Sequence, residues 1–294
     1  MRPRHIALAV LLAVIWGFNW VVIKIGLAGV SPLALCFARF LLVSIPAIFF
    51  IKRPAAPLKL IALYGLTMFA CQFSLLFIGM YLGITAGLAS LLVQAQVFFT
   101  ILLAVSFLGE KINKWQILGA LISFTGIGVI GIHWSNNISL MGFMLVIAAA
   151  VSWSIGNLIA KKLHKVDAFS LIIWGSFISL LPTLLASLWF EGVDKFIYCF
   201  YHLSWTSFAA ILYLVIASTL FGFTTWCWLL TKYPMSTVAP FSLLVPIIAM
   251  LSSALVLKES FQSWKILAAT LVITGLGVNI LLTKMTGGNK ISKK

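Results

Sequence analysis

The chain has 294 residues, and its composition is far more apolar than that of a soluble protein. Hydrophobic residues make up 63% and charged residues 9%, whereas a soluble domain has about 45–50% apolar and about 25% charged residues. No soluble core of this length can hide so much apolar surface, which excludes a soluble enzyme and a disordered chain. Lys and Arg number 20 against five Asp and Glu, but they lie between apolar runs rather than in one patch. We therefore expect a lipid bilayer, and not nucleic acid, as the partner.

Apolar runs follow one another along the chain, each close to the ~20 residues that cross a bilayer as a helix. Because backbone polar groups in lipid have to bond internally, we expect an all-α integral membrane protein. The first run has a basic start but no small-residue cleavage site, so we interpret it as a retained anchor. The longest connection runs from about Phe190 to Ser204. The ten predicted transmembrane helices are 5–23, 32–51, 60–78, 87–108, 115–132, 141–160, 169–189, 205–229, 236–257 and 264–283.

The distribution of cations predicts the orientation of these spans. Most Lys and Arg residues fall on the side that holds both chain termini, and Arg39 lies within the second span. Only Lys24, Lys195, Lys258 and Lys265 fall on the other side. Since cytoplasmic connections are enriched in Lys and Arg, we expect a multi-pass protein of the inner (plasma) membrane with both termini in the cytoplasm.

The two halves of the chain repeat each other. Residues 110–129 and 259–278 align without gaps and are identical at nine of 20 positions, including Glu110 with Glu259 and the motif Gly-x-Gly. We expect these glycines to serve close helix packing. The repeat divides the chain into 5–132 and 141–283, with five predicted helices each. Because five is odd, the halves have to insert with opposite orientations, and such inverted repeats are a recurring design of transporters.

These features resemble the EamA repeat of the drug/metabolite transporter superfamily, over about 6–132 and 141–282. The similarity is carried by Trp16-Gly17-x-Asn19, Ala38-Arg39-Phe40, the Glu-x4-Trp-x10-Gly-x-Gly tails, Pro240 and Pro246. Within the superfamily the chain is most similar to bacterial exporters of O-acetylserine and cysteine, on residues 87–99, Gly142-Phe143-Met144 and Ser152-Trp153-x3-Asn157. The resemblance implies two inverted five-helix repeats, a central cavity between them, and export of amino acids or related metabolites by alternating access.

Polar side chains within the predicted spans are the candidate substrate-binding residues, because they are expensive in mid-membrane. Arg39 suits a carboxylate, to which a guanidinium donates two hydrogen bonds. The alternative is that Arg39 extends to the membrane surface or bonds carbonyls at a helix end. The full set is Trp16, Asn19, Arg39, Gln72, Ser90, Gln94, Gln96, Trp153, Asn157 and Ser242.

Two Trp–Asn pairs occupy matching places in the repeat. Trp16 and Asn19 lie three residues apart and Trp153 and Asn157 lie four apart, so each pair shares one face of its helix. In such a pair the amide can bond the head of a zwitterion while the ring packs against its side chain. The alternative for each pair is an interhelical hydrogen bond beside a Trp that faces lipid.

Three glutamines and a serine lie on the third and fourth predicted helices. Gln94 and Gln96 are directed about 200° apart at about 100° per residue, so a straight helix cannot aim both at one cavity. Either one of them joins helices, or the helix is distorted there. Ser90 shares a face with Gln94, and Gln72 lies on the preceding helix.

Hydroxyls of the eighth and ninth helices complete the candidates. Ser242 and the carbonyls that Pro246 frees are placed to face the cavity, although a static kink explains this proline equally well. The eighth helix gives a weaker signal, because hydroxyls in such helices often bond their own backbone. Its polar and aromatic residues are Ser218, Thr219, Thr224, Thr225, Trp226 and Trp228.

All five acidic residues lie at predicted helix ends or in connections. Carriers that couple to protons or sodium commonly hold a carboxylate in mid-membrane, so we expect indirect coupling, exchange or facilitated export. Glu110 and Glu259 are each expected to close their own helix end, the alternative being a cap-like or gate-like contact with a basic neighbour such as Lys111 or Lys258.

Among function classes, the sequence favours a secondary transporter of small metabolites. It contains no HExxH motif and no acid or His within the predicted core, so we expect no enzyme, catalytic residue, metal or cofactor. The alternatives are export of other metabolites or drugs, or flipping of a lipid carrier. A flippase requires several cations in the cavity, and only Arg39 qualifies.

Overall fold

The computed structural model describes residues 1–108, 113–132, 139–163, 166–232, 238, 241–242, 244–259 and 262–282. Throughout these residues the regular structure is helical, as the composition predicts. Six helices are long and apolar enough to cross a membrane: Pro3–Leu27, Leu58–Tyr81, Ala86–Phe107, Leu140–Lys162, Ala168–Glu191 and Trp205–Trp226. Four shorter apolar helices, Pro32–Ile48, Lys114–Ile130, Leu244–Leu257 and Ser263–Gly277, lie within the remaining predicted spans.

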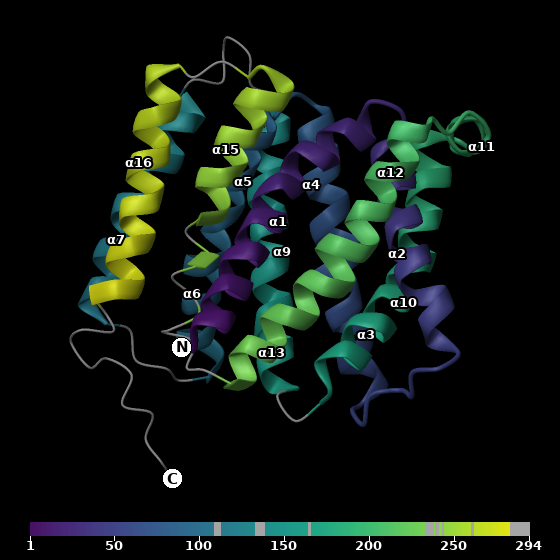
Figure 1. Ribbon diagram of the computed structural model, residues 1–294, viewed down its shortest axis with the longest axis horizontal. Helices are drawn as coiled ribbons and strands as arrows, with labels where there is room; N and C mark the ends of the chain where they lie inside the picture. Colours follow the sequence, from purple (N-terminus) through teal and green to yellow (C-terminus); the bar gives the residue numbers. More distant parts are fainter. Residues whose placement is uncertain are drawn as a thin grey trace.

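The helices run up and down the bundle in chain order (Figure 1). Those of the first half are α1 (Pro3–Leu27), α2 (Pro32–Ile48), α3 (Leu58–Gly65), α4 (Gln72–Tyr81), α5 (Ala86–Leu92), α6 (Gln96–Leu108) and α7 (Lys114–Ile132). Those of the second half are α9 (Leu140–Lys162), α10 (Ala168–Ala186), α11 (Val193–Tyr201), α12 (Trp205–Tyr213), α13 (Thr224–Lys232), α15 (Leu244–Leu257) and α16 (Ser263–Gly277). We call the end where α1 begins and α16 ends the near end, and the opposite end the far end.

Several spans depart from regular α-helix, and the departures recur in related places of the two halves. The π-helical turns η1 (Leu66–Cys71) and η4 (Leu214–Phe223) join α3 to α4 and α12 to α13. The 3-10 turn η2 (Val93–Ala95) joins α5 to α6, and residues 241–242 also have 3-10 geometry. One alternative for the Gln94–Gln96 spacing, a distorted helix, is therefore what the structure contains.

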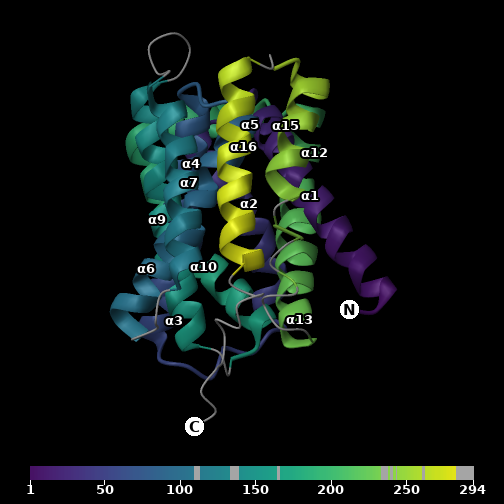
Figure 2. The same ribbon diagram turned by 90° about the vertical axis from the view of Figure 1, so that its left-hand side faces the viewer.

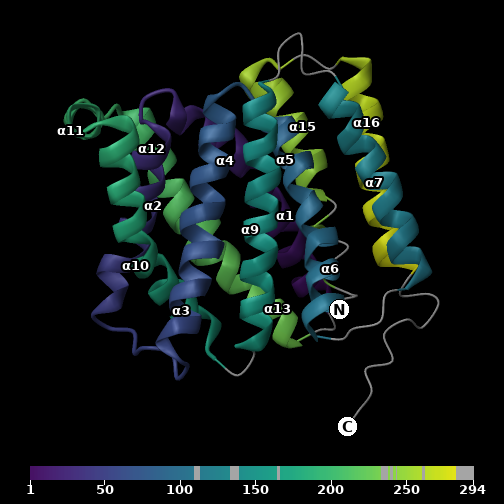
Figure 3. The same cartoon turned by 180° about the vertical axis from the view of Figure 1, so that it is seen from behind.

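Two antiparallel helix pairs lie on opposite sides of the bundle. The pair α2–α10 lies on one side and α7–α16 on the other, and α7 and α16 stay side by side in both side and rear views (Figures 2 and 3). Between them, α1 packs on α15 and α4 packs on α9. Toward its N-terminus α1 leans away from its neighbours (Figure 2).

The predicted connection between about Phe190 and Ser204 is not a plain loop. It contains the helix α11, which begins after Gly192, whose φ of 90° lies in the region that favours glycine. Aromatic side chains around α11 are almost fully exposed, among them Trp189, Tyr201 and Trp205. Trp and Tyr are enriched at membrane–water interfaces, and their exposure at the far end fits that position.

Candidate functional site

The side chain of Arg39 is the central feature of the candidate site. It lies on α2, is 1% exposed, and has no carboxylate among its hydrogen-bond partners in the described part of the chain. Its Nε and Nη2 donate to Oγ1 of Thr219 over 3.0 and 2.8 Å, and Nη2 also donates to Oγ of Ser218 over 3.4 Å. The guanidinium lies 4.1 Å from the ring centroid of Phe73. It also lies 5.5 Å from the ring centroid of Phe40. Among the described residues its partners are thus hydroxyls and two rings, and a buried cation without an anionic partner retains the capacity to bind an anion.

The π-helical geometry of η4 places the hydroxyl that Arg39 uses. Thr219 Oγ1 donates to the carbonyl of Leu214, five residues earlier, over 2.7 Å, and this leaves its lone pairs directed at the guanidinium. The sequence signal for Thr219 was weak because a hydroxyl that bonds its own backbone is common. Thr219 does that and also accepts from Arg39, which only the contact between α2 and η4 reveals.

Trp16 and Arg39 meet at one residue of η4. Trp16 Nε1 donates to the carbonyl of Ser218 over 3.2 Å, while the hydroxyl of Ser218 accepts from Arg39. The ring of Trp16 packs 5.5 Å from that of Phe223 and fits over Gly222. Trp16 therefore packs against the eighth span, and its indole N–H is bonded within the protein.

Three of the candidate residues each have one buried polar atom that lacks a hydrogen-bond partner. These atoms are Nη1 of Arg39, Oδ1 of Asn19 and Oε1 of Gln72. Asn19 lies one turn after Trp16, and Gln72 directly precedes Phe73, on which Arg39 stacks. One free donor and two free acceptors complement a molecule with both a carboxylate and an ammonium group, since a buried polar atom without a partner is costly.

A second polar group joins α6 to α9. Asn157 Nδ2 donates to Oε1 of Gln96 over 3.0 Å and to Oγ1 of Thr100 over 3.2 Å. Ser154 Oγ donates to the backbone carbonyl of Gln96 over 3.0 Å. The two amides bond each other in this conformation, as the interhelical alternative for Asn157 predicts, and a substrate contact for either stays a prediction.

The remaining candidates lie apart from the Arg39 group. Gln94 is buried in the 3-10 turn η2, and Ser90 Oγ donates to the carbonyl of Gly87 over 2.6 Å. Trp153 is half-buried against the core, and Ser242 is half-buried in the short 3-10 segment. The structure thus brings Trp16 and Arg39 together at Ser218. Gln72 directly precedes Phe73, on which Arg39 stacks, and Asn19 lies one helical turn after Trp16.

The expectation that Glu259 closes its own helix end is confirmed for its backbone N–H, which donates to the carbonyl of Ser253 on α15 over 3.3 Å, next to Lys258 with a φ of 54°. Its carboxylate reaches further and accepts from the backbone N–H groups of Ala86 and Gly87, which belong to α5 of the other half. Helix α5 is the better partner because its first N–H groups have no acceptor within the helix. Glu110 and Lys111 lie outside the described residues.

The chain matches the model of the EamA-like transporter family twice, over residues 4–132 and 140–281. It is 41% identical over 287 residues to an Escherichia coli protein named "Probable amino-acid metabolite efflux pump", covering 95% of this chain and 96% of that protein. A Salmonella typhimurium protein of the same name is also 41% identical, with 93% of each chain covered. A Streptantibioticus cattleyicolor protein named "Probable terminal-alkyne amino-acid exporter" is 26% identical, with 96% of this chain and 94% of that protein covered. A solved crystal structure matches the fold with a TM-score of 0.64 and 17% identity, covering 98% of this chain and all of that one.

Proposed function

The chain belongs to the EamA-like transporter family, and from this premise we propose that it exports amino acids or related small metabolites by alternating access. It is a multi-pass membrane protein, and its relatives carry the names of amino-acid and metabolite exporters. Secondary transport across the inner membrane is the activity, and small zwitterions of the cysteine or O-acetylserine type are the substrates.

The observation that carries the substrate class is the state of Arg39. A buried guanidinium with no carboxylate partner among the described residues and one unpartnered nitrogen suits the carboxylate of an amino acid. The free oxygens of Asn19 and Gln72 suit its ammonium group, and the rings of Trp16 and Phe73 suit the rest of the molecule.

The architecture we propose has ten spans in two inverted five-helix repeats. The contacts between α7 and α16 support this architecture. When each residue of a contact is replaced by the residue that corresponds to it in the other repeat, the result is another contact of the same pair. Gly119 faces Gly275 and Gly126 faces Ala268, and in the repeat alignment Gly119 corresponds to Ala268 and Gly126 to Gly275. Between these contacts, Ser123 Oγ donates to the carbonyl opposite over 3.1 Å. Such reciprocity is what a two-fold axis in the membrane plane produces.

The cation distribution supports an orientation with both termini in the cytoplasm. In that orientation the near end of the bundle is cytoplasmic and the far end faces outward.

Efflux from cells preloaded with labelled amino acids and O-acetylserine tests the substrate class. In cells that express the protein, we expect faster loss of cysteine or O-acetylserine than in cells without it. In the R39K variant we expect that gain to fall by about tenfold or more, because an ammonium group cannot replace the two-pronged donor and stacked plane of the guanidinium. The R53K variant is the matched control, since Arg53 is exposed in a connection.

Full efflux by R39K would overturn the role of Arg39. Faster loss of other amino acids alone would replace the substrate but keep the transport activity. Lipid-carrier flipping without any efflux would overturn the proposed substrate class.

A further inference from the structure

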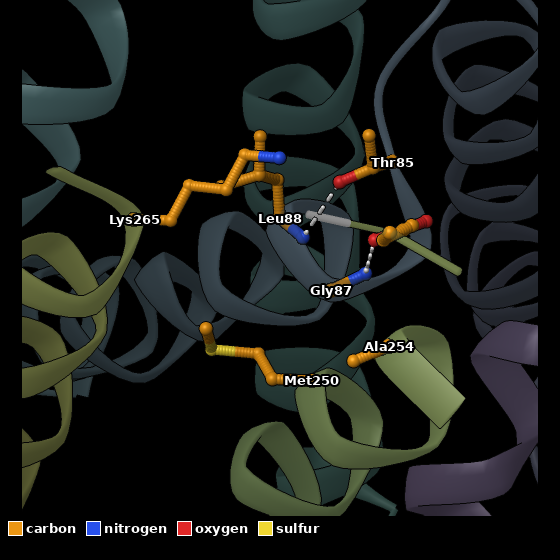
Figure 4. A pocket seen from close by; sticks show the side chains of 7 residues that line it. Thr85, Gly87, Leu88, Met250, Ala254 and Lys265 are labelled. Carbon is orange, nitrogen blue, oxygen red and sulfur yellow. Dashed lines mark hydrogen bonds between the residues drawn. The ribbon is translucent and has the colours of Figure 1, made fainter. Parts of the chain in front are cut away.

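A carboxylate of the second half holds the start of a helix of the first half at the far end of the bundle. Oε1 of Glu259 accepts from the N–H of Ala86 over 2.9 Å. Oε2 accepts from the N–H of Gly87 over 3.4 Å, and Figure 4 shows this second bond. The backbone of Glu259 is itself fixed, because its N–H donates to the carbonyl of Ser253 on α15 over 3.3 Å. This contact therefore bridges α15 and the beginning of α5.

The bridge closes over a very small space. A hollow of about 20 Å³, enough for one water molecule, lies beneath it. Gly87 packs so closely on α15 that an added Cβ would lie 3.3 Å from Cγ of Met250. The hollow is lined by Thr85, Gly87, Leu88, Met250, Ala254, Glu259 and Lys265 (Figure 4).

Lys24 extends the same contact to two more spans. Its Nζ donates to the carbonyl of Met80 over 2.9 Å, which ties the end of α1 to the end of α4. Its ammonium group makes no ion pair with Glu259 among the described residues, and the two opposite charges attract each other only at longer range. The two charged groups together hold four spans at the far end.

Helix α5 is separated from the rest of its span by an interruption of the α-helix. It ends at Leu92, where the 3-10 turn η2 interrupts the α-helix before α6 begins at Gln96. Such interruptions at element ends commonly act as hinges. Release of the N-terminus of α5 would therefore not require the whole span to shift.

The far end also contains a chemically similar contact that supplies a control. Glu191 accepts from the N–H groups of Leu33 and Ala34 over 2.8 and 3.2 Å and from the hydroxyls of Ser31 and Ser187. It joins α2 to the end of the α10 span, and these two spans already pack on each other. Breaking this contact leaves that pairing in place.

We propose that Glu259, assisted by Lys24, is the gate residue that keeps the far end closed, and that α5 leaves it when the transporter opens outward. The proposal rests on the proposed function in one respect, because only a transporter has to open this end. Glu191, in contrast, is a static fastening between α2 and α10.

Labelling of a single cysteine tests the gate without any substrate. Leu88 lines the hollow and its side chain is buried, so a membrane-impermeant maleimide cannot reach this position while α5 stays in place. In an L88C protein whose four native cysteines are replaced by alanine, the labelling rate from outside intact cells therefore reports opening of the far end. We expect E259Q to raise this rate several-fold, because an amide removes the charge and one acceptor, and E191Q to leave it unchanged. K24M, which removes the bond to Met80, is expected to raise the rate as well.

Equal rates in E259Q and E191Q would overturn the proposal, as would an unchanged rate in E259Q. Should E259Q fail to reach the membrane, an unchanged rate in K24M overturns the proposal and an increased rate supports it. Because labelling needs no amino acid, a gate effect without amino-acid efflux would refute the proposed substrate and leave the gate intact.

Discussion

Burial of the Arg39 guanidinium costs free energy, because the charged group loses its contacts with water. Hydrogen bonds to hydroxyl groups offset this cost, and most of them come from the Thr219 side chain. Two of the three hydrogen bonds of Arg39 end on Oγ1 of Thr219. In T219V a methyl group replaces this oxygen at nearly the same volume, which leaves Nε and part of Nη2 without a partner. We expect the free energy of unfolding to fall by about 1–3 kcal/mol, the cost of an unsatisfied buried polar group.

Thermal unfolding of the purified protein in detergent measures this loss. T219S is the control, because it keeps the hydroxyl and should stay close to the parent. A T219V protein as stable as the parent would show that Arg39 finds other partners.

The sequence narrowed the candidate site to the right residue types but not to their partners. Arg39 stands out because it is a cation within an apolar run, which composition alone reveals. Its hydrogen bonds to Thr219 depend on how α2 lies against η4. Which helices contact each other cannot be read from the pattern of residues in one sequence. Gln96 and Asn157 illustrate the same limit, since an amide that bonds a substrate and one that bonds another amide look alike in sequence.

At the scale of helices, hydropathy located the apolar spans but not their internal irregularities. The π-helical turns η1 and η4 lie in apolar runs whose few hydroxyl residues, Thr67, Ser218 and Thr219, occur equally in regular helices, so the composition of these runs does not mark the change of hydrogen-bond register. The sequence predicts a connection where the structure has α11, because this helix is short and has polar residues between its aromatic ones. Its exposed aromatic rings become interpretable only when its position at the far end is known.

The Gly-x-Gly motifs of α7 and α16 divide into one packing glycine and one free glycine each. A Cβ on Gly275 would lie 2.5 Å from the carbonyl oxygen of Gly119, whereas a Cβ on Gly277 would have no neighbour within 4 Å. The expected packing role therefore holds for Gly126 and Gly275 but not for Gly128 and Gly277.

This difference predicts opposite outcomes for two alanine substitutions. G275A should lower the free energy of unfolding by about 1–3 kcal/mol, because an overpacked contact forces the two helices apart. G277A should be neutral or stabilising by up to about 1 kcal/mol, since alanine favours a helix over glycine. Thermal unfolding of both variants under the same conditions tests this prediction. An equal loss of stability in G275A and G277A would contradict the packing described for α7 and α16.

For the whole molecule, the two outer pairs and the bridge at the far end suggest how the bundle changes state. The pairs α2–α10 and α7–α16 each join one helix of either half, so they can remain fixed while the spans between them tilt. The Glu259 contact joins α15 to α5 within that central region, whereas Glu191 joins members of an outer pair. The inverted repeat that we propose predicts a second, related arrangement in which the near end is closed instead.

This scheme requires the far end to face outward, which a labelling experiment on intact cells tests. Arg53 is exposed in the connection after α2 at the near end, and Tyr201 is 85% exposed at the end of α11 at the far end. In a background without native cysteines, we expect Y201C to react with an impermeant maleimide in intact cells and R53C to react only after the membrane is permeabilised. The reason is the excess of Lys and Arg at the near end, which retains that side in the cytoplasm. The reverse labelling pattern would show that the far end faces the cytoplasm. The Glu259 contact would then close the cytoplasmic side, and the proposed direction of gating would have to be reversed.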